Sequence, residues 1–355
     1  MKGKIMDHTI PHPDLYGVPA ETTEFNGMPY RLLGKSGLRV SNVGLGTWKV
    51  GFPETGDGAR VDEKTAFKIF DRAIELGVTF WDTANRYNNA AGNSERVIGR
   101  WFKNNPDQRR NVILATKMGG GMDGVTPNHS NLGRINILES VYASLARLQL
   151  EYVDVLYFHG PDPVTPVEES LAAVEDLISR DLVRYFAVSN HTVQQLIAYQ
   201  TAERLLSPRC RILAVQNQFD IIQGENSNYA GVFDFCVKNG ISFIAWSPLA
   251  RGLISDRYLD PSRIVQGDRL YDEKLMKWCE NKTVMAKIHQ LTNLAKEWGI
   301  ETTQLALAYM LTLPAMGPVI PSATSVKQLE SNAEAGKITL NPEQCARVKA
   351  ILSRN

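Results

Sequence analysis

The chain has 355 residues, of which 43% are hydrophobic and 22% are charged, as is typical of a globular protein. Its 39 Lys and Arg residues against 38 Asp and Glu residues leave a net charge of +1, so no strong field would attract nucleic acid or an anionic membrane. The four cysteines lack metal-binding or redox spacing, and no apolar stretch is long enough to span a bilayer. We therefore expect a cytoplasmic protein with free thiols, no nucleic-acid partner and no membrane insertion.

Short apolar runs alternate with amphipathic patterns along most of the chain. Residues 1–27 show little periodicity and are predicted to be an extension outside the fold. Tyr30–Leu33 and Arg39–Val40, joined by a Gly-Lys-Ser-Gly turn, are predicted to form a β-hairpin. The strands predicted after it are Val43–Thr47, Val78–Asp82, Val112–Lys117, Val153–His159, Arg184–Asn190, Ile212–Gln216, Ile241–Trp246 and Pro318–Pro321. Helical spacing of apolar residues covers Thr65–Leu76, Ile135–Leu148, Val167–Ser179 and Val284–Trp298.

The number and order of these elements indicate the fold class. Continuous apolar strands that alternate with helices are typical of a parallel sheet buried on both faces, and eight such units favour an α/β (β/α)8 TIM barrel. The interval after the seventh strand is too long for one unit, which predicts an extended loop over Arg251–Glu280 and an extra helix over Thr302–Leu313. Because no linker-like segment divides the chain, residues 28–355 are predicted to be a single domain.

Ionisable side chains stand at the predicted ends of three successive strands, where TIM barrels carry their active sites. They are Asp82, Lys117 and His159, and Tyr87 follows Asp82 by five residues. Each alone has a structural interpretation, such as a turn cap or a satisfied core histidine, but the combination is improbable in a purely structural barrel. A lysine held by an aspartate would lower the tyrosine pKa, and a histidine could bind or protonate a carbonyl oxygen. Such a site needs a hydride donor, which predicts a nicotinamide cofactor.

Two other patterns are not interpreted as sites. Gly34-Lys35-Ser36 suggests a phosphate loop, but Pro29 occupies the position of the leading glycine and no helix pattern follows. His8 and His12 are four residues apart but flank a proline in a polar segment, so we expect no metal site.

The residues at the strand ends resemble the motifs of the aldo-keto reductase superfamily over residues 28–335. The matching segments are Val43-Gly44-Leu45-Gly46-Thr47-Trp48, Asp82-Thr83-Ala84 with Tyr87, Ala115-Thr116-Lys117, His159, Val188-Ser189-Asn190, Gln216-Asn217 and Trp246-Ser247-Pro248-Leu249. Within the superfamily, Trp246–Ala250 and Arg134 ahead of a long helix resemble the branch of potassium-channel β subunits and their bacterial relatives.

The resemblance implies NADP(H)-dependent reduction of aldehydes or ketones to alcohols. It implies a catalytic tetrad of Asp82, Tyr87, Lys117 and His159, with Tyr87 as the general acid. Ser189, Asn190 and Gln216 would hold the nicotinamide carboxamide, and Trp246 would stack on its ring. The other cofactor-binding residues that it implies are Gly46, Thr47, Trp48, Asp82, Ser247, Pro248, Leu249, Gly252, Arg257, Arg263, Pro321, Ser322, Thr324, Gln328 and Asn332. The substrate-binding residues that we expect are Trp48, Tyr87, Asn88, Met118 and His159.

The sequence departs from the superfamily pattern at Thr324 and Asn88 and keeps the superfamily residue at His159, and all three positions bear on function. Thr324 stands where many relatives place an arginine against the adenosine phosphate, which weakens the preference for NADP(H), although Lys327, Arg257 or Arg263 could substitute. NADP(H) is favoured, and NAD(H) stays open. Asn88 replaces the glycine that usually follows the tyrosine, which alters the loop beside the pocket. His159 stands where mammalian channel subunits tend to have asparagine, which favours a working reductase.

Two other functions stay open at this point. The channel-subunit resemblance allows a slow-turnover regulatory subunit that senses its nicotinamide cofactor. Lys117 could also form a Schiff base, as lysines on barrel strands do in aldolases, although a lysine paired with Asp82 is a poor nucleophile. The expected partner is a small carbonyl substrate, aliphatic or aromatic, whose identity the sequence does not give. Relatives in this branch often form tetramers or octamers, which leaves a homo-oligomer open.

Overall fold

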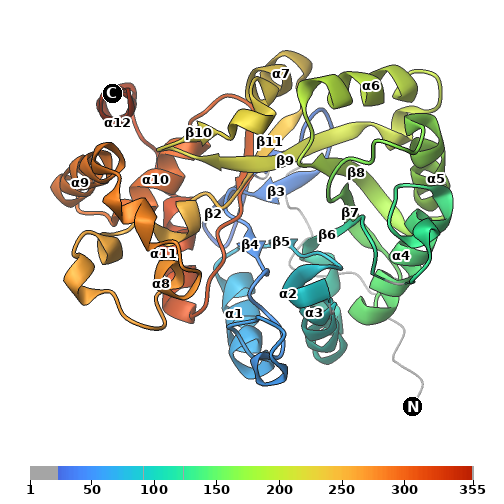
Figure 1. Ribbon diagram of the computed structural model, residues 1–355, viewed down its shortest axis with the longest axis horizontal. Coiled ribbons are helices and arrows are strands. Elements are labelled where there is room, and N and C mark those ends of the chain that lie inside the picture. The colour runs from blue at the N-terminus through green and yellow to red at the C-terminus, as the bar shows by residue number, and fades with distance from the viewer. Residues whose placement is uncertain (1–22, 91, 123, 354–355) are drawn as a thin grey trace.

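Eight parallel strands curl into a closed barrel that helices surround (Figure 1) in the computed structural model, which describes residues 23–90, 92–122 and 124–353. Each strand pairs in parallel with the next one along the chain, and bridges from Val43 to Val319 and from Gly46 to Ser322 join the last strand to the first. The strands are β4 (Leu45–Gly46), β5 (Phe80–Asp82), β6 (Ile113–Met118), β7 (Val153–Phe158), β8 (Val183–Ser189), β9 (Ile212–Asp220), β11 (Ser242–Trp246) and β12 (Met316–Val319). The predicted (β/α)8 barrel is confirmed.

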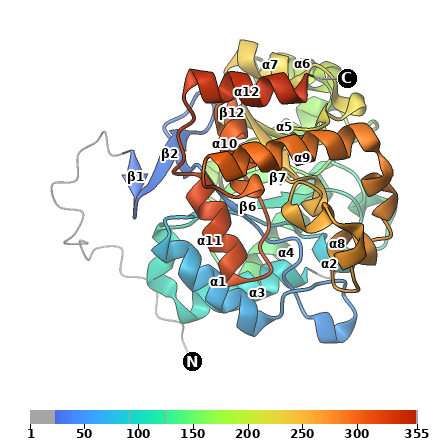
Figure 2. The ribbon, with the colours of Figure 1, turned by 90° about the vertical axis from the view of Figure 1, so that its left-hand side faces the viewer.

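The helices cover the outside of the barrel. Polar caps begin several of them: the Asp62 carboxylate accepts a hydrogen bond from the Thr65 amide, and Thr192 and Asn341 each start a capping box. The helices are α1 (Glu63–Glu75), α3 (Asn93–Asn104), α4 (Arg134–Leu148), α5 (Val167–Ser179), α6 (Val193–Glu203), α7 (Val232–Asn239), α9 (Lys282–Glu297), α10 (Thr302–Leu311), α11 (Val326–Ala335) and α12 (Pro342–Leu352). Figure 2 shows α9, α10, α11 and α12 on one side of the molecule. No helix among the described residues is long and apolar enough to cross a membrane.

The N-terminal hairpin closes one end of the barrel. Strands β2 (Met28–Leu32) and β3 (Arg39–Ser41) pair in antiparallel fashion, as predicted. Leu33, Leu38 and Val40 of the hairpin belong to the cluster of buried side chains that fills the barrel interior. Gly34 has a φ of +55°, and a Cβ there would clash with the carbonyl oxygen of Leu213, so only glycine fits this close approach.

A third, very short strand extends the hairpin beyond the prediction. β1 (Glu24–Phe25) pairs with β2 in antiparallel fashion, although its residues fall within the extension predicted over residues 1–27. Two exposed residues give no alternating pattern from which a strand could be recognised. Residues 1–22, with His8 and His12, lie outside the described part of the chain.

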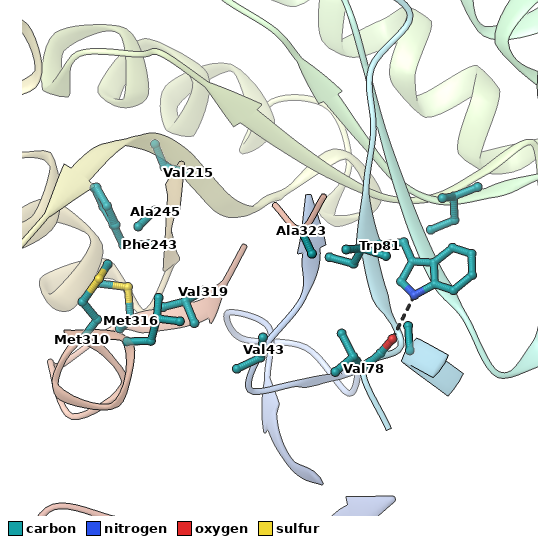
Figure 3. Packing of buried hydrophobic residues seen from close by; sticks show 14 of the residues in the cluster. Val43, Val78, Trp81, Val215, Phe243, Ala245, Met310, Met316, Val319 and Ala323 are labelled. Atoms are coloured by element: carbon teal, nitrogen blue, oxygen red, sulfur yellow. Dashed lines mark hydrogen bonds between the residues drawn. The ribbon is translucent and has the colours of Figure 1, made fainter. Parts of the chain in front are cut away.

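Buried hydrophobic residues form two layers, one inside the barrel and one between barrel and helices. Trp81 of β5 belongs to the outer layer, where its ring stacks on Phe70 with the centroids 4.7 Å apart. Its indole N–H donates to the Val78 carbonyl (Figure 3). Its neighbour Phe80 belongs to the inner layer. Because side chains alternate along a strand, Asp82 must point to the same side as Phe80, into the barrel.

The same alternation makes further polar side chains point into the barrel at the carboxyl ends of the strands. Ala115 on β6 and Ala214 on β9 are interior residues, so Lys117 and Gln216 lie two positions further along the same inward rows. Val155 and Tyr157 form the inward row of β7, which His159 continues just beyond the end of the strand. The carboxyl ends of parallel strands therefore bring these groups together opposite the hairpin.

The connection between β11 and β12 is long, as predicted, but it is not a simple loop. It contains α8 (Arg269–Asp272) and several single-turn helices before α9 and α10. The turns are Ala250–Gly252, Asp256–Tyr258, Pro261–Arg263 and Met276–Glu280.

Candidate active site

A buried hydrogen-bond network joins Asp82, Lys117 and Tyr87. The Lys117 ammonium donates to the Asp82 carboxylate, to the Thr83 carbonyl oxygen at 3.0 Å and to the Tyr87 hydroxyl oxygen at 2.8 Å. The Tyr87 hydroxyl donates to Asp82 Oδ1 at 3.2 Å. Lys117 is 1% exposed, so its charge would be costly without these partners. All three of its protons are engaged, which argues against a nucleophilic, Schiff-base lysine.

The protonation of this network differs from the simple expectation that lysine lowers the tyrosine pKa. Burial and the negative charge of Asp82 raise the pKa of Tyr87 well above its usual value, so this part of the expectation is wrong. Burial also lowers the pKa of Lys117, while the Asp82 carboxylate opposes that shift. The raised pKa of Tyr87 has two causes, the burial of its hydroxyl and the contact of Asp82 with the tyrosine as well as with the lysine. Tyr87 is consequently a protonated phenol at neutral pH, which suits a proton donor.

His159 lies beside the tyrosine in a neutral form. The two rings meet edge to face with centroids 6.0 Å apart. Burial, together with the positive charges of Lys117 and Arg86, lowers the pKa of His159 to about 3. An imidazole with this pKa is uncharged at neutral pH and can donate one hydrogen bond to a substrate oxygen.

A second set of hydrogen bonds links the network to the neighbouring strand ends. Gln216 Nε2 donates to Asp82 Oδ2 at 2.8 Å, and the Ser189 hydroxyl donates to the Gln216 carbonyl oxygen at 2.7 Å. The Asn190 amide donates to the His159 carbonyl oxygen at 2.7 Å and accepts from the Trp246 indole at 3.0 Å. The side chains of β5, β6, β8, β9 and β11 are thus fixed relative to one another before any ligand binds.

A cavity of about 820 Å³ opens above this network and extends along the segments that follow β11 and β12. Tyr87, His159 and Trp246 line one part of it, whereas Lys117 lies beneath Tyr87 and does not line it. Apart from two residues, all predicted cofactor-binding residues line the cavity: Gly46, Trp48, Asp82, Ser189, Asn190, Gln216, Trp246, Ser247, Pro248, Leu249, Gly252, Arg257, Pro321, Ser322, Thr324, Gln328 and Asn332.

Besides Lys117, four of the predicted site residues do not line the cavity. Thr47 is fully buried, and its hydroxyl donates to the Asp82 carbonyl oxygen at 2.9 Å. Asn88 is buried and donates to the Val50 carbonyl oxygen at 2.5 Å. Met118 packs in the outer layer, because it follows the inward-facing Lys117 along β6. Arg263 lies in the single-turn helix Pro261–Arg263 and is also absent from the lining.

The segment that follows β11 has a strained backbone where it lines the cavity. Ser247, Ala250 and Arg251 have φ values of 56°, 47° and 57°, in the left-handed region that residues other than glycine rarely adopt. Gly252 follows with a φ of 100°. Such strain is concentrated at ligand-binding segments, and turns of this kind can present backbone N–H groups to anions.

Most of the positive charges around the cavity are neutralised by carboxylates. Glu273 contacts Lys49, Arg251 and Arg269 at 3.5, 3.3 and 2.9 Å, and Arg257 makes two hydrogen bonds of 2.7 Å to Asp268. Arg60 pairs with Asp272. Two of the lining cations differ: within the described ranges, neither Arg86 nor Lys327 has a hydrogen bond or a carboxylate partner. Arg86 directly precedes Tyr87 in the chain, and Lys327 stands between Thr324 and Gln328 at the start of α11; all of these residues line the cavity.

The sequence interpretation missed two residues near the network. Arg86 directly precedes Tyr87, and its position in the same motif was a signal that it lies near the site. Tyr157 is fully buried inside the barrel, and the Lys117 ammonium lies 5.7 Å from its ring centroid. Its spacing of two residues before His159 on a strand was the signal that both face inward.

Comparison with known families agrees with this geometry. The model of the Aldo/keto reductase family matches residues 42–353, which include every strand of the barrel and all members of the network. Members of this family are oxidoreductases that act on carbonyl compounds with a nicotinamide cofactor. The chain therefore belongs to the aldo/keto reductase family.

Proposed function

We propose that the protein reduces aldehydes or ketones to alcohols with NADP(H), and that Tyr87 is the general acid. The observation that carries the proposal is the Tyr87 hydroxyl in the cavity lining, held by Lys117 and Asp82 and next to the His159 ring. A phenol that is protonated and fixed by two charged groups is suited to protonate a carbonyl oxygen.

The side chains around the cavity fit a nicotinamide dinucleotide in their chemistry. Ser189, Asn190 and Gln216 offer hydroxyl and amide groups for a carboxamide, and Trp246 offers a flat apolar face for its ring. The strained segment after β11 suits a pyrophosphate. When bound, the reduced cofactor would supply the hydride that adds to the carbonyl carbon.

The hydrogen-bond network also accounts for the transfer of a proton to the substrate oxygen. As negative charge develops on the substrate oxygen, the Tyr87 hydroxyl turns from Asp82 to that oxygen and transfers its proton. The ammonium of Lys117, which already donates to the Tyr87 oxygen at 2.8 Å, stabilises the phenolate that remains. The neutral imidazole of His159 orients the carbonyl by donating a hydrogen bond to its oxygen.

Lys327 is the basis for proposing NADP(H) rather than NAD(H). Thr324 cannot provide the positive charge that a 2′-phosphate requires, and Arg257 is neutralised by two hydrogen bonds to Asp268. Lys327 follows Thr324 by three residues, lines the cavity with it and has no carboxylate partner in the part of the chain that the structure describes. Its ammonium would pair with the phosphate.

The test is oxidation of NADPH by the purified protein with methylglyoxal, glyceraldehyde and para-nitrobenzaldehyde, with NADH in parallel. Turnover that is faster with NADPH is the expected result. Tight NADPH binding without turnover of any carbonyl would instead favour the regulatory, channel-β-like alternative. If neither nucleotide binds, the proposal is wrong.

A further inference from the structure

We propose that Arg86 selects carbonyl substrates that carry a carboxylate group. This inference rests on the proposed reductase function and names a substrate class for it. Arg86 is an exposed side chain of the loop between β5 and the short α2 (Tyr87–Ala90), and it lines the cavity together with Tyr87 and His159.

The position of Arg86 is set by its neighbours. A Cβ at Gly120 would clash with Arg86 Nη1, so the guanidinium lies against the backbone of the glycine-rich segment that follows β6. It is close enough to His159 that its charge contributes to the low pKa of that imidazole. An anion bound by Arg86 would therefore lie on the same side of the cavity as the two groups proposed to contact the carbonyl oxygen.

The electrostatics of this part of the cavity leave one positive charge without a counter-charge. Lys117 is compensated by Asp82, and His159 is neutral. Arg86 has no hydrogen bond or carboxylate partner among residues 23–90, 92–122 and 124–353, whereas the other arginines of the lining all have one. A guanidinium presents two parallel N–H groups, which match the two oxygens of a carboxylate.

The amount of charge favours a carboxylate over a phosphate. A carboxylate carries one negative charge, which the single guanidinium balances, whereas a phosphate ester carries about −1.5 to −2 at neutral pH. The excess negative charge of a phosphate would lie without a counter-charge in a part of the cavity whose lining also includes the buried Asp82. The structure thus suits carbonyl compounds with a carboxylate at one end, such as oxo acids and aldehyde acids.

The experiment compares para-carboxybenzaldehyde with para-nitrobenzaldehyde, two aldehydes of similar shape that differ in charge. The readout is the ratio of their kcat/KM values with NADPH, in which general losses of activity cancel. We expect Arg86→Gln to lower this carboxylate-to-nitro ratio at least tenfold, mainly through KM, and Arg86→Lys to lower it less. Lys327→Gln is the matched control, since it removes a positive charge elsewhere in the cavity and should leave the ratio unchanged.

Binding of benzoate provides a readout that needs no cofactor and no turnover. Trp48 and Trp246 line the cavity, so their fluorescence should report occupancy. Benzoate should quench this fluorescence, and its dissociation constant from the titration should be at least tenfold lower for the wild-type protein than for Arg86→Gln. A ratio and a benzoate affinity that Arg86→Gln leaves unchanged would overturn the inference. If neither aldehyde is reduced, the proposed function fails, and the benzoate titration alone then decides on Arg86.

Discussion

The two ends of the barrel are built from the same strands but filled in opposite ways. At the amino-terminal ends of the strands, the hairpin inserts Leu33, Leu38 and Val40 into an apolar interior. At the carboxyl ends, the same inward-facing rows end in charged and amide side chains such as Lys117 and Gln216, and a cavity opens above them. The difference separates stability from chemistry, because burial at one end does not depend on the polar groups at the other.

The two ends are also stabilised by different interactions. Each fully buried leucine of the hairpin stabilises the fold by about 1.5–3 kcal/mol relative to an exposed one. The buried charges of Lys117 and Asp82 instead cost several kcal/mol each in desolvation, which their mutual contact and hydrogen bonds offset. The carboxyl end is thus held by pairing, and the hairpin end by packing.

Replacing Lys117 with methionine should have the largest effect. It should disrupt the hydrogen-bond network at the carboxyl ends of the strands and leave the hairpin end of the barrel unchanged. Turnover should fall by about 10²–10⁴, because Tyr87 loses the charge that stabilises its phenolate. The free energy of unfolding should fall by about 3–5 kcal/mol, because Asp82 is left buried without its partner. Steady-state kinetics and urea unfolding measure the two effects.

A double variant separates these two causes. Adding Asp82→Asn to Lys117→Met removes the unpaired carboxylate, so much of the lost stability should return while activity stays low. If the double variant is no more stable than Lys117→Met, the pairing argument for this end of the barrel is wrong.

Leu33→Ala tests the opposite end. Leu33 is fully buried, so the cavity left behind should lower the free energy of unfolding by about 2–5 kcal/mol. Because the hairpin does not reach the cavity at the other end, kcat and KM of the folded enzyme should change less than twofold. A marked change in KM at conditions where the variant is fully folded would contradict the separation of the two ends.

Acid should weaken the folded state through His159, at the carboxyl end. Its pKa is about 3 in the folded protein against an ordinary value of 6.5, so between these values the unfolded chain binds a proton that the folded chain does not. The free energy of unfolding should therefore fall as the pH falls, and by about 2 kcal/mol from this group between pH 7 and pH 5. Urea unfolding of His159→Gln at both pH values should show a fall that is smaller by that amount. If the free energy of unfolding falls equally in the wild-type protein and in His159→Gln, His159 is not the source of the acid sensitivity.

Lys327→Gln should have the smallest effect, because the change affects an exposed contact. KM for NADPH should rise about tenfold with little change in KM for NADH, since only the 2′-phosphate loses a partner. Equal changes in KM for the two nucleotides would show that Lys327 does not bind the 2′-phosphate.

Strand periodicity explains how much of the fold and the site could be predicted. The inward rows of the strands place Asp82, Lys117 and Gln216 at one end of the barrel, and these were found because apolar runs with polar ends are a local pattern. Met118 was assigned to the pocket, although alternation from Lys117 turns it to the outer layer. The helices α6, α7, α11 and α12 were not predicted, because they are short or only weakly amphipathic. The helix α3 was also not predicted, although its apolar residues lie on one face.

The charges around the cavity could not be predicted in the same way. Arg257 was a candidate for a cofactor phosphate, but the fold of the segment after β11 brings Asp268 against it, and residues eleven apart in an irregular loop have no periodic relation. Arg86 likewise has no carboxylate partner among the residues that the structure describes, and this depends on how irregular segments pack around the cavity. Pairing across irregular segments is tertiary information that local patterns do not contain.

The most direct test of the central claim, that Tyr87 is the proton donor, is NADPH oxidation with para-nitrobenzaldehyde by the wild-type protein and by Tyr87→Phe, with NADPH binding followed by fluorescence in both. Phenylalanine keeps the ring beside His159 and removes only the hydroxyl. We predict that turnover falls by about 10²–10⁴ while the affinity for NADPH changes less than threefold. Wild-type turnover in Tyr87→Phe would contradict the mechanism.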